Sequence, residues 1–154
     1  MSRSATYSTP AIVLRTRLIG EKDRVMTLLS PNEGKFDAVA KGARSPKSKL
    51  AATSQPFVHA RFLIARGRSL DIISQAAVET AHPHISADLW RTAWANLVCE
   101  MSSIVPERQP DIALFEILGR TLTVLDDTSR HANDIEIAGL WFQAQFLKIG
   151  RAHV

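Results

Sequence analysis

Cysteine is almost absent from this 154-residue sequence, in which Cys99 is the single one. One cysteine excludes an internal disulfide and any zinc site built from several cysteines. Aromatic residues are also scarce, at 6% of the chain, and no uncharged apolar stretch approaches the roughly 20 residues that a membrane-spanning helix requires. The N-terminus lacks the apolar segment of a secretory signal, so we expect a cytoplasmic protein.

Motifs of common enzymes are missing as well. The sequence has no glycine-rich phosphate-binding loop, no nucleophile elbow and no pair of carboxylates at a catalytic spacing. We therefore expect neither an enzyme nor a bound cofactor. The five histidines are scattered along the sequence: His59, His82, His84, His131 and His153. His82 and His84 flank a proline and have no cysteine or carboxylate ligand nearby, so we expect no metal site.

Charge, in contrast, is plentiful and unevenly distributed. Residues 1–80 contain 13 Lys and Arg against 6 Asp and Glu, whereas residues 81–154 contain 6 against 9. The basic half is suited to a polyanionic partner, and the mildly acidic half to packing or protein contacts. The densest basic segment is residues 39–49, which holds Lys41, Arg44, Lys47 and Lys49 without an acidic residue. Such a loop favours binding to phosphate, although a merely solvated loop has the same composition.

Short segments of alternating polar and apolar residues fill the chain from residue 11 to residue 78. This period of two predicts strands near residues 12–17, 24–29, 35–41, 57–65 and 70–78. The turn Pro31–Gly34 joins the second and third strands, and Gly34 can adopt the positive φ that such a turn needs. The turn Arg66–Arg68 joins the last two. Five short strands predict a small barrel of either OB or SH3 type.

After residue 84 the apolar period changes to 3.6, which predicts a boundary between a barrel over residues 1–80 and a helical segment over residues 81–148. We expect Ser86 to cap the first helix, Pro106 to end it, Pro110 to open the second and Asp134 to lie near the start of the third. Each helix has one apolar stripe that we expect to be buried: Trp90, Trp94, Leu97, Met101 and Ile104; Leu114 or Phe115, Leu118, Leu122 and Leu125; and Ile137, Trp141, Ala144 and Leu147.

Several motifs of the basic half together resemble the N-terminal domain of the bacterial RecO family of recombination mediators. The order and spacing of Val39–Ser45, Lys49–Leu50 and Gln55–Phe57 carry the resemblance. It is supported by Ala11–Leu14, Gly20–Glu21, Gly34 and Arg66–Arg68. The likeness covers residues 10–80 by motif, and the helical segment to about residue 148 by pattern alone.

The resemblance implies a five-stranded OB-type barrel joined to an incomplete α-helical domain. It further implies a nucleoid-associated protein that binds single- and double-stranded DNA, anneals complementary strands and catalyses no covalent step. With the partner RecR it would help to load the recombinase RecA onto strands covered by single-stranded DNA-binding protein (SSB). Its helical part would bind the acidic, Phe-ending SSB tail, with Arg91, Arg108 and Arg120 as candidate partners of the tail's acids.

The sequence departs from the family at its C-terminal end. Members of the family usually continue with further helices, and many carry a cysteine zinc knuckle there, whereas this sequence has neither. The last six residues, 149–154, are also what the reading frame ATC GGA AGA GCA CAC GTC of a sequencing adapter encodes. We therefore expect a truncated fragment with a non-native tail over these residues.

The expected DNA contacts are basic. Lys41, Arg44, Lys47 and Lys49 come first, the turn residues Arg66 and Arg68 form an opposite wall, and Arg15, Arg24 and Arg17 extend the track if their side chains point outward. We expect Phe36, Phe57 and Phe62 to belong to the core, so binding should depend on the DNA backbone and on salt. A protein-interaction adaptor with a basic barrel and an RNA-binding OB protein remain alternative interpretations.

Overall fold

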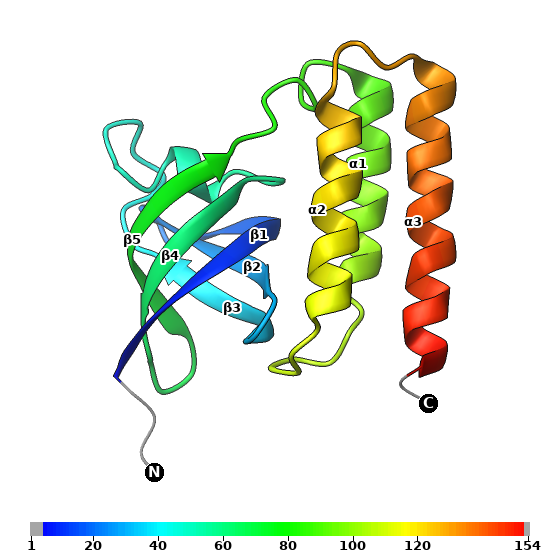
Figure 1. Cartoon of the computed structure of the whole chain (residues 1–154). Helices are drawn as coiled ribbons and strands as arrows, with labels where there is room; N and C mark the ends of the chain where they lie inside the picture. The colour runs from blue at the N-terminus through cyan, green and yellow to red at the C-terminus, as the bar shows by residue number, and fades with distance from the viewer. Residues whose placement is uncertain (1–4, 153–154) are drawn as a thin grey trace.

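The computed structural model describes residues 5–152, with side chains through residue 150. It contains five strands followed by three helices, and the helices lie beside the barrel (Figure 1). The strands close into a barrel in the order β1-β2-β3-β5-β4, in which β1 pairs with both β2 and β4 and β3 pairs in parallel with β5. This five-stranded barrel is of the OB type, which confirms the fold class and decides between the two barrels that the sequence left open.

The strand bounds follow the predicted segments closely except in β1, which begins six residues earlier and ends two residues later than predicted. They are β1 (Thr6–Ile19), β2 (Asp23–Ser30), β3 (Gly34–Ala40), β4 (His59–Ala65) and β5 (Asp71–Thr80), with a short 3-10 turn, Ala52–Ser54, between β3 and β4. Burial alternates along β3, where Phe36, Ala38 and Ala40 face the barrel interior and the residues between them are half-buried. The alternation of apolar and polar residues in the sequence therefore corresponds to side chains that point alternately into and out of the barrel.

Strand β1 serves two cores at once. Its Ala11 and Val13 pack inside the barrel, whereas Ile12 and Leu14 belong to the cluster formed with the helices. A register shift between Val13 and Arg15 bends the strand, so that its first half pairs with β4 and its second half with β2. The helices therefore cover the outer side of the barrel near the middle of β1.

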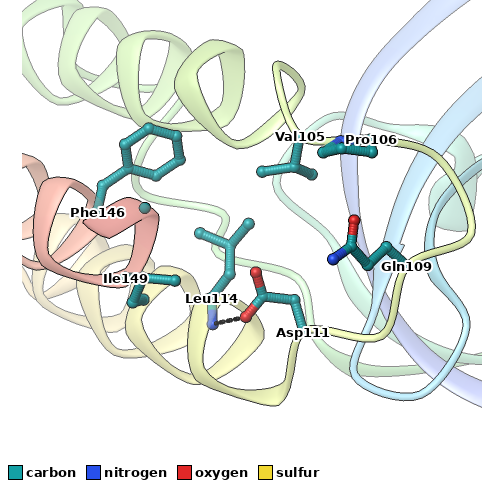
Figure 2. Close-up of a pocket in the computed structure, with 8 residues that line it drawn as sticks. Val105, Pro106, Gln109, Asp111, Leu114, Phe146 and Ile149 are labelled. Carbon is teal, nitrogen blue, oxygen red and sulfur yellow. Dashed lines mark hydrogen bonds between the residues drawn. The ribbon is translucent and has the colours of Figure 1, made fainter. Parts of the chain in front are cut away.

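Three helices form the second part: α1 (Leu89–Ser102), α2 (Ile112–Asp126) and α3 (Ala132–Ala152). Asp88 caps α1 by accepting the Trp90 N–H at 2.8 Å, so Ser86 was the wrong cap. Asp111 caps α2 by accepting the Leu114 N–H at 3.0 Å (Figure 2), which places Pro110 before the helix rather than at its first position. A carboxylate at the N-cap satisfies a free backbone N–H and favours the positive end of the helix dipole.

The apolar stripe is the buried face in α2 but not in α1 or α3. In α2 Leu114, Leu118, Leu122 and Leu125 are all buried, as predicted. In α1 the buried residues are instead Arg91, Ala95, Val98, Cys99 and Ser102, and in α3 they include Ile135, Ala138 and Phe142. Trp90, Ile104, Ile137 and Leu147 are 45%, 74%, 63% and 64% exposed, so the predicted burial of these residues is wrong.

Small residues contribute to the difference in α1. Ala95, Cys99 and Ser102 allow the neighbouring elements to approach α1 closely, while the larger Trp94 rests on α3 at Gly139, where an added Cβ would lie 2.1 Å from the indole ring. Hydrophobicity alone does not distinguish a close-packed small face from a large apolar stripe.

The linker between α1 and α2 fastens the helices to the β2–β3 hairpin. Arg108 N donates to the Lys35 carbonyl at 2.9 Å, and Lys35 Nζ donates to the Ser103 carbonyl at 2.6 Å. At Gly34, whose φ is +70°, an added Cβ would lie 2.3 Å from the Gln109 carbonyl oxygen. Gly34 thus provides both the turn predicted from the sequence and room for the linker.

A pocket of about 240 Å³ lies between this linker, the start of α2 and the end of α3 (Figure 2). Val105 and Leu114 face Phe146 and Ile149 across it, so its lining is mainly apolar. Within residues 5–152, no helix is long and apolar enough to span a membrane.

Candidate nucleic-acid interface

The basic segment forms the β3–β4 loop, and hydrogen bonds between its own residues shape it. Ser45 N donates to the Gly42 carbonyl at 3.2 Å, Ser48 N to the Ser45 carbonyl at 3.0 Å and Ala51 N to the Ser48 carbonyl at 3.2 Å. Buried Ala43 fixes the start of the loop on the barrel core. These successive turns give the loop a defined path, along which its lysines project.

The loop also packs against the β1–β2 turn. Gly42, at φ +71°, donates its N–H to Asp23 Oδ1 at 2.8 Å. Arg44 donates its backbone N–H to the Lys22 carbonyl at 3.1 Å and its Nη1 to the Gly20 carbonyl at 2.6 Å. Two segments that are distant in the sequence thus form one surface at the same end of the barrel.

All four predicted cations of the loop are exposed: Lys41, Arg44, Lys47 and Lys49. None of them takes part in an ion pair within residues 5–150. A surface depression of about 500 Å³ lies where the loop meets the β1–β2 turn, and its lining includes Lys22, Arg44 and Ser45 as well as Glu21. The structure therefore brings the predicted loop residues together as exposed, unneutralised positive charge.

The second predicted turn lies at the other end of strand β3. Arg66 forms an ion pair with Glu33, which directly precedes β3, at 3.6 Å, whereas Lys41 directly follows β3. The loop and the turn lie correspondingly far apart in Figure 1. In OB folds the face of β2 and β3 is the common ligand surface, with the β1–β2 and β4–β5 loops beside it. The turn and the loop therefore mark two ends of this face instead of the two walls of one groove.

The two arginines of that turn differ in their surroundings. Arg66 is half-buried, and its guanidinium lies 4.2 Å from the centre of the Tyr7 ring. Arg68 is exposed and appears in no ion pair of the described residues. Arg68 is therefore the residue of this turn whose charge faces solvent.

The remaining predicted residues are dispersed. Arg15 is exposed beside Glu100 of α1, at the junction of barrel and helices. Arg24 is half-buried opposite Ala40 and next to the β1–β2 turn, and its Nε has no hydrogen-bond partner in the described part of the chain. Arg17 points outward and pairs with Asp37 at 3.7 Å. Of the three, Arg24 lies nearest in the fold to the basic loop.

The phenylalanines of the barrel are core residues, as predicted. Phe36, Phe57 and Phe62 are 2%, 4% and 0% exposed, so none offers a ring to a nucleic-acid base. A contact through basic side chains to phosphate is the interaction that this surface can make.

Sequence reasoning missed a charge cluster around the buried Asp71 at the β4–β5 end of the barrel. Asp71 accepts hydrogen bonds from the Tyr7 hydroxyl at 2.7 Å and from Arg108 Nη2. Burial alone would raise the pKa of Asp71, but the hydrogen bonds from Tyr7, Arg108 and the Gly67 N–H lower it. Tyr7, Asp71 and Arg108 are 37 to 101 positions apart in the chain, so no local pattern could reveal the cluster.

Tyr7 provides a direct test of this cluster, since it is the only tyrosine in the sequence. Burial and the hydrogen bond to Asp71 raise its pKa to about 12. We expect ultraviolet absorbance to show phenol ionisation near that pH in the folded protein and near 10 after denaturation. Because the folded state holds the proton more tightly, the stability that this shift contributes is complete below pH 10 and is lost as the pH rises toward 12. Ionisation near 10 in the folded protein would contradict the observed geometry.

Comparison with known proteins places the barrel in a family. The model of the family described as "Recombination protein O N terminal" matches residues 1–81. The chain belongs to the RecO family. A protein of Synechococcus elongatus named DNA repair protein RecO is 43% identical over 127 residues, which are 82% of this chain and 48% of that protein. Relatives of the same name from Bifidobacterium adolescentis and Symbiobacterium thermophilum are 38% and 37% identical over 86% and 82% of this chain.

The RecO relatives are longer than this chain, which spans about half of their length, between 48% and 54% of each of the three. The matched part includes the barrel and extends into the helices, since an alignment of 136 residues exceeds the barrel alone. The resemblance inferred from the motifs of residues 10–80 is thereby confirmed.

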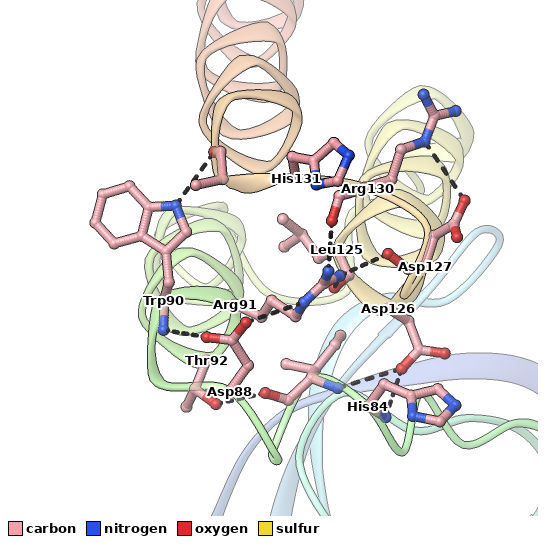
Figure 3. A network of polar contacts seen from close by, with 12 residues as sticks. His84, Asp88, Trp90, Arg91, Thr92, Leu125, Asp126, Asp127, Arg130 and His131 are labelled. Atoms are coloured by element: carbon pink, nitrogen blue, oxygen red, sulfur yellow. Dashed lines mark hydrogen bonds and ion pairs between the residues drawn. The ribbon is translucent and has the colours of Figure 1, made fainter.

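In the helical part of this RecO-family chain, two of the three arginines expected to bind an acidic tail have internal roles. Arg91 is 8% exposed and donates to the carbonyls of Leu125, Asp127 and Arg130 at 2.7, 2.8 and 2.8 Å (Figure 3). Arg108 is bound to Asp71 within the charge cluster. Neither has a free guanidinium, so both expectations are wrong.

Arg120 is different, because it is exposed at a groove between α2 and α3. Its guanidinium lies 5.1 Å from the centre of the Trp141 ring. Arg130 also lines this groove, together with apolar Val124 and Ile137. Arg120 thus remains a candidate for an acidic ligand.

Proposed function

We propose that this chain acts in DNA repair by binding the DNA backbone through the β3–β4 loop of its barrel. The observation that carries the proposal is the set of four exposed cations on that loop, which take part in no ion pair with the residues that the structure describes. They lie beside the face that OB folds use for nucleic acids. The names of the RecO relatives support the biological setting. Lys41, Arg44, Lys47 and Lys49 would contact phosphates, with Arg24 and Arg68 extending the track and Arg15 and Arg66 contributing less.

Such binding would work by charge neutralisation. Basic side chains that replace condensed counterions release them, and this release favours binding to strands of any sequence. Two complementary strands held by such proteins repel each other less, so annealing is accelerated without a catalytic group. The buried phenylalanines agree with this mechanism, since base stacking would require exposed rings.

We further propose that the helical part binds the acidic tail of SSB, and that the complete protein loads RecA together with RecR. The groove between α2 and α3 supports the first step, because Arg120 and Arg130 can pair with carboxylates while Trp141 and Ile137 can receive an apolar end. Labelled SSB-tail peptide should bind the chain, and Arg120→Ala should weaken the binding without changing DNA affinity.

Fluorescence anisotropy across a salt series tests the DNA-binding proposal. If each loop cation neutralises about one phosphate, the logarithm of the affinity for single strands should fall with a slope of about −3 against the logarithm of the salt concentration. Raising salt from about 50 to about 200 mM should then weaken binding roughly 50-fold. An affinity that does not depend on salt would overturn the proposal. A marked preference for RNA of the same length, or binding to acidic peptide alone, would favour the RNA-binding or the adaptor interpretation.

A further inference from the structure

The β4–β5 turn carries Arg66 and Arg68, and Asp71 holds its geometry. Asp71 opens β5, is 6% exposed and accepts the Gly67 N–H at 3.2 Å through Oδ1. The turn is tight, because an added Cβ at Gly67 would lie 1.9 Å from the Leu70 carbonyl oxygen. The position of Asp71 therefore determines the path of the turn.

Arg108 of the α1–α2 linker reaches the other oxygen of the same carboxylate. Its Nη2 donates to Asp71 Oδ2, which also accepts the Tyr7 hydroxyl. Its guanidinium lies 4.4 Å from the centre of the Phe36 ring, at the end of the barrel core. Its backbone N–H donates to Lys35, so the residue is fixed at both its backbone and its side chain.

A second link joins Arg108 to the turn through Glu33. Glu33 Oε2 accepts Arg108 Nη1 at 3.4 Å, and Glu33 Oε1 pairs with Arg66 Nη2 at 3.6 Å. The two arginines and the two acids form a neutral group. Without Arg108, two carboxylates would face one arginine, and Arg66 would be drawn further toward them and away from solvent.

We propose that Arg108 is a positioning residue that holds the β4–β5 turn in its DNA-binding geometry and so couples DNA affinity to the seating of the helical linker. This inference rests on the proposed DNA-binding function. Arg108 itself touches no DNA in this scheme, because its guanidinium is directed at Asp71, Glu33 and Tyr7.

Amide hydrogen exchange tests whether Arg108 stabilises the β4–β5 turn, and it does so without DNA. In Arg108→Met we expect the Gly67 amide to exchange at least tenfold faster, while the core of α2 exchanges as in the wild type, which shows that the change is local. Unchanged exchange at Gly67 would overturn the proposal, whether or not the wild-type protein binds DNA. If the wild-type protein did not bind DNA, the proposed function would be overturned, but the exchange result would remain valid.

Double-mutant cycles on DNA affinity test the coupling. Arg108→Met should weaken binding about threefold, its effect should nearly vanish when Arg68 is already alanine, and it should stay about threefold when Lys47 is already alanine. Arg108→Lys keeps the charge but not the paired donors, so it should recover less than half of the loss. Full recovery with Lys and additivity with Arg68→Ala would show a simple charge effect and overturn the coupling.

Discussion

Replacing Lys41, Lys47 and Lys49 with alanine is expected to remove most of the affinity for DNA. These side chains are exposed and appear in no ion pair of the described residues, so their removal should leave the barrel intact. With about 0.7 counterions released per phosphate on single strands, three lost contacts correspond to roughly a 100-fold weaker complex near 0.1 M salt. The salt slope should become less steep by about 2. Anisotropy titrations at several salt concentrations measure both quantities.

Arg44 is treated separately because it has a second role. Its Nη1 bonds to the Gly20 carbonyl, so Arg44→Ala would remove a cation and also loosen the loop from the β1–β2 turn. We expect Arg44→Ala added to the triple variant to lower the affinity further. Arg44→Lys keeps the charge but not the hydrogen bond to Gly20, so it should restore the salt dependence of binding more fully than the affinity itself.

A matched control removes the same charge elsewhere. Arg61, Arg130 and Lys148 are exposed and lie outside the basic loop, so their triple alanine variant has the same net charge as the loop variant. Its affinity should fall less than fivefold, since exposed charges beyond about 10 Å are largely screened at 0.1 M salt. Equal losses in the two triple variants would show that overall charge, and not the loop, governs binding.

Local signals in the sequence were sufficient for the strands of the barrel, but not for the type of barrel that they form. Alternation along residues 35–41 and the turn at Gly34 have local causes, and the structure realises both in β3 and its hairpin. The basic loop was found in the same way, because exposure follows from the density of charge in residues 39–49. Composition and turn chemistry act over a few residues, so they can be read directly.

Contacts between distant segments were not predictable. Arg91 looked like an exposed cation on a helix, yet it is buried because the carbonyls at the end of α2, 34 to 39 residues later, need donors. Arg108 reaches Asp71 because the α1–α2 linker passes over the β2–β3 hairpin, with Arg108 itself at a φ of +58°. Such pairings form because buried polar groups need hydrogen-bond partners. They leave no periodic pattern in a single sequence.

Arg91→Met is expected to cause a large loss of stability in the helical part. The guanidinium joins Asp88 at the start of α1 to three carbonyls around the end of α2 and the linker to α3 (Figure 3). Methionine fills a similar volume but donates nothing, so the buried carbonyl of Leu125 and the part-buried carbonyls of Asp127 and Arg130 lose this partner. We expect the free energy of unfolding to fall by about 3 kcal/mol and the melting temperature by about 10 °C. Thermal and urea denaturation followed by circular dichroism measure the change.

Arg130→Met provides the control, because Arg130 makes an exposed ion pair with Asp127 at 3.4 Å in the same region. Exposed pairs of this kind contribute little, so its stability should stay within about 0.5 kcal/mol of the wild type. Arg91→Lys should lie between the two, since one ammonium group cannot serve carbonyls that the structure places on two separate guanidinium nitrogens. If Arg91→Met were as stable as Arg130→Met, the carbonyls at the end of α2 would have to find other donors, and the network would not be what holds α1 against α2 and α3.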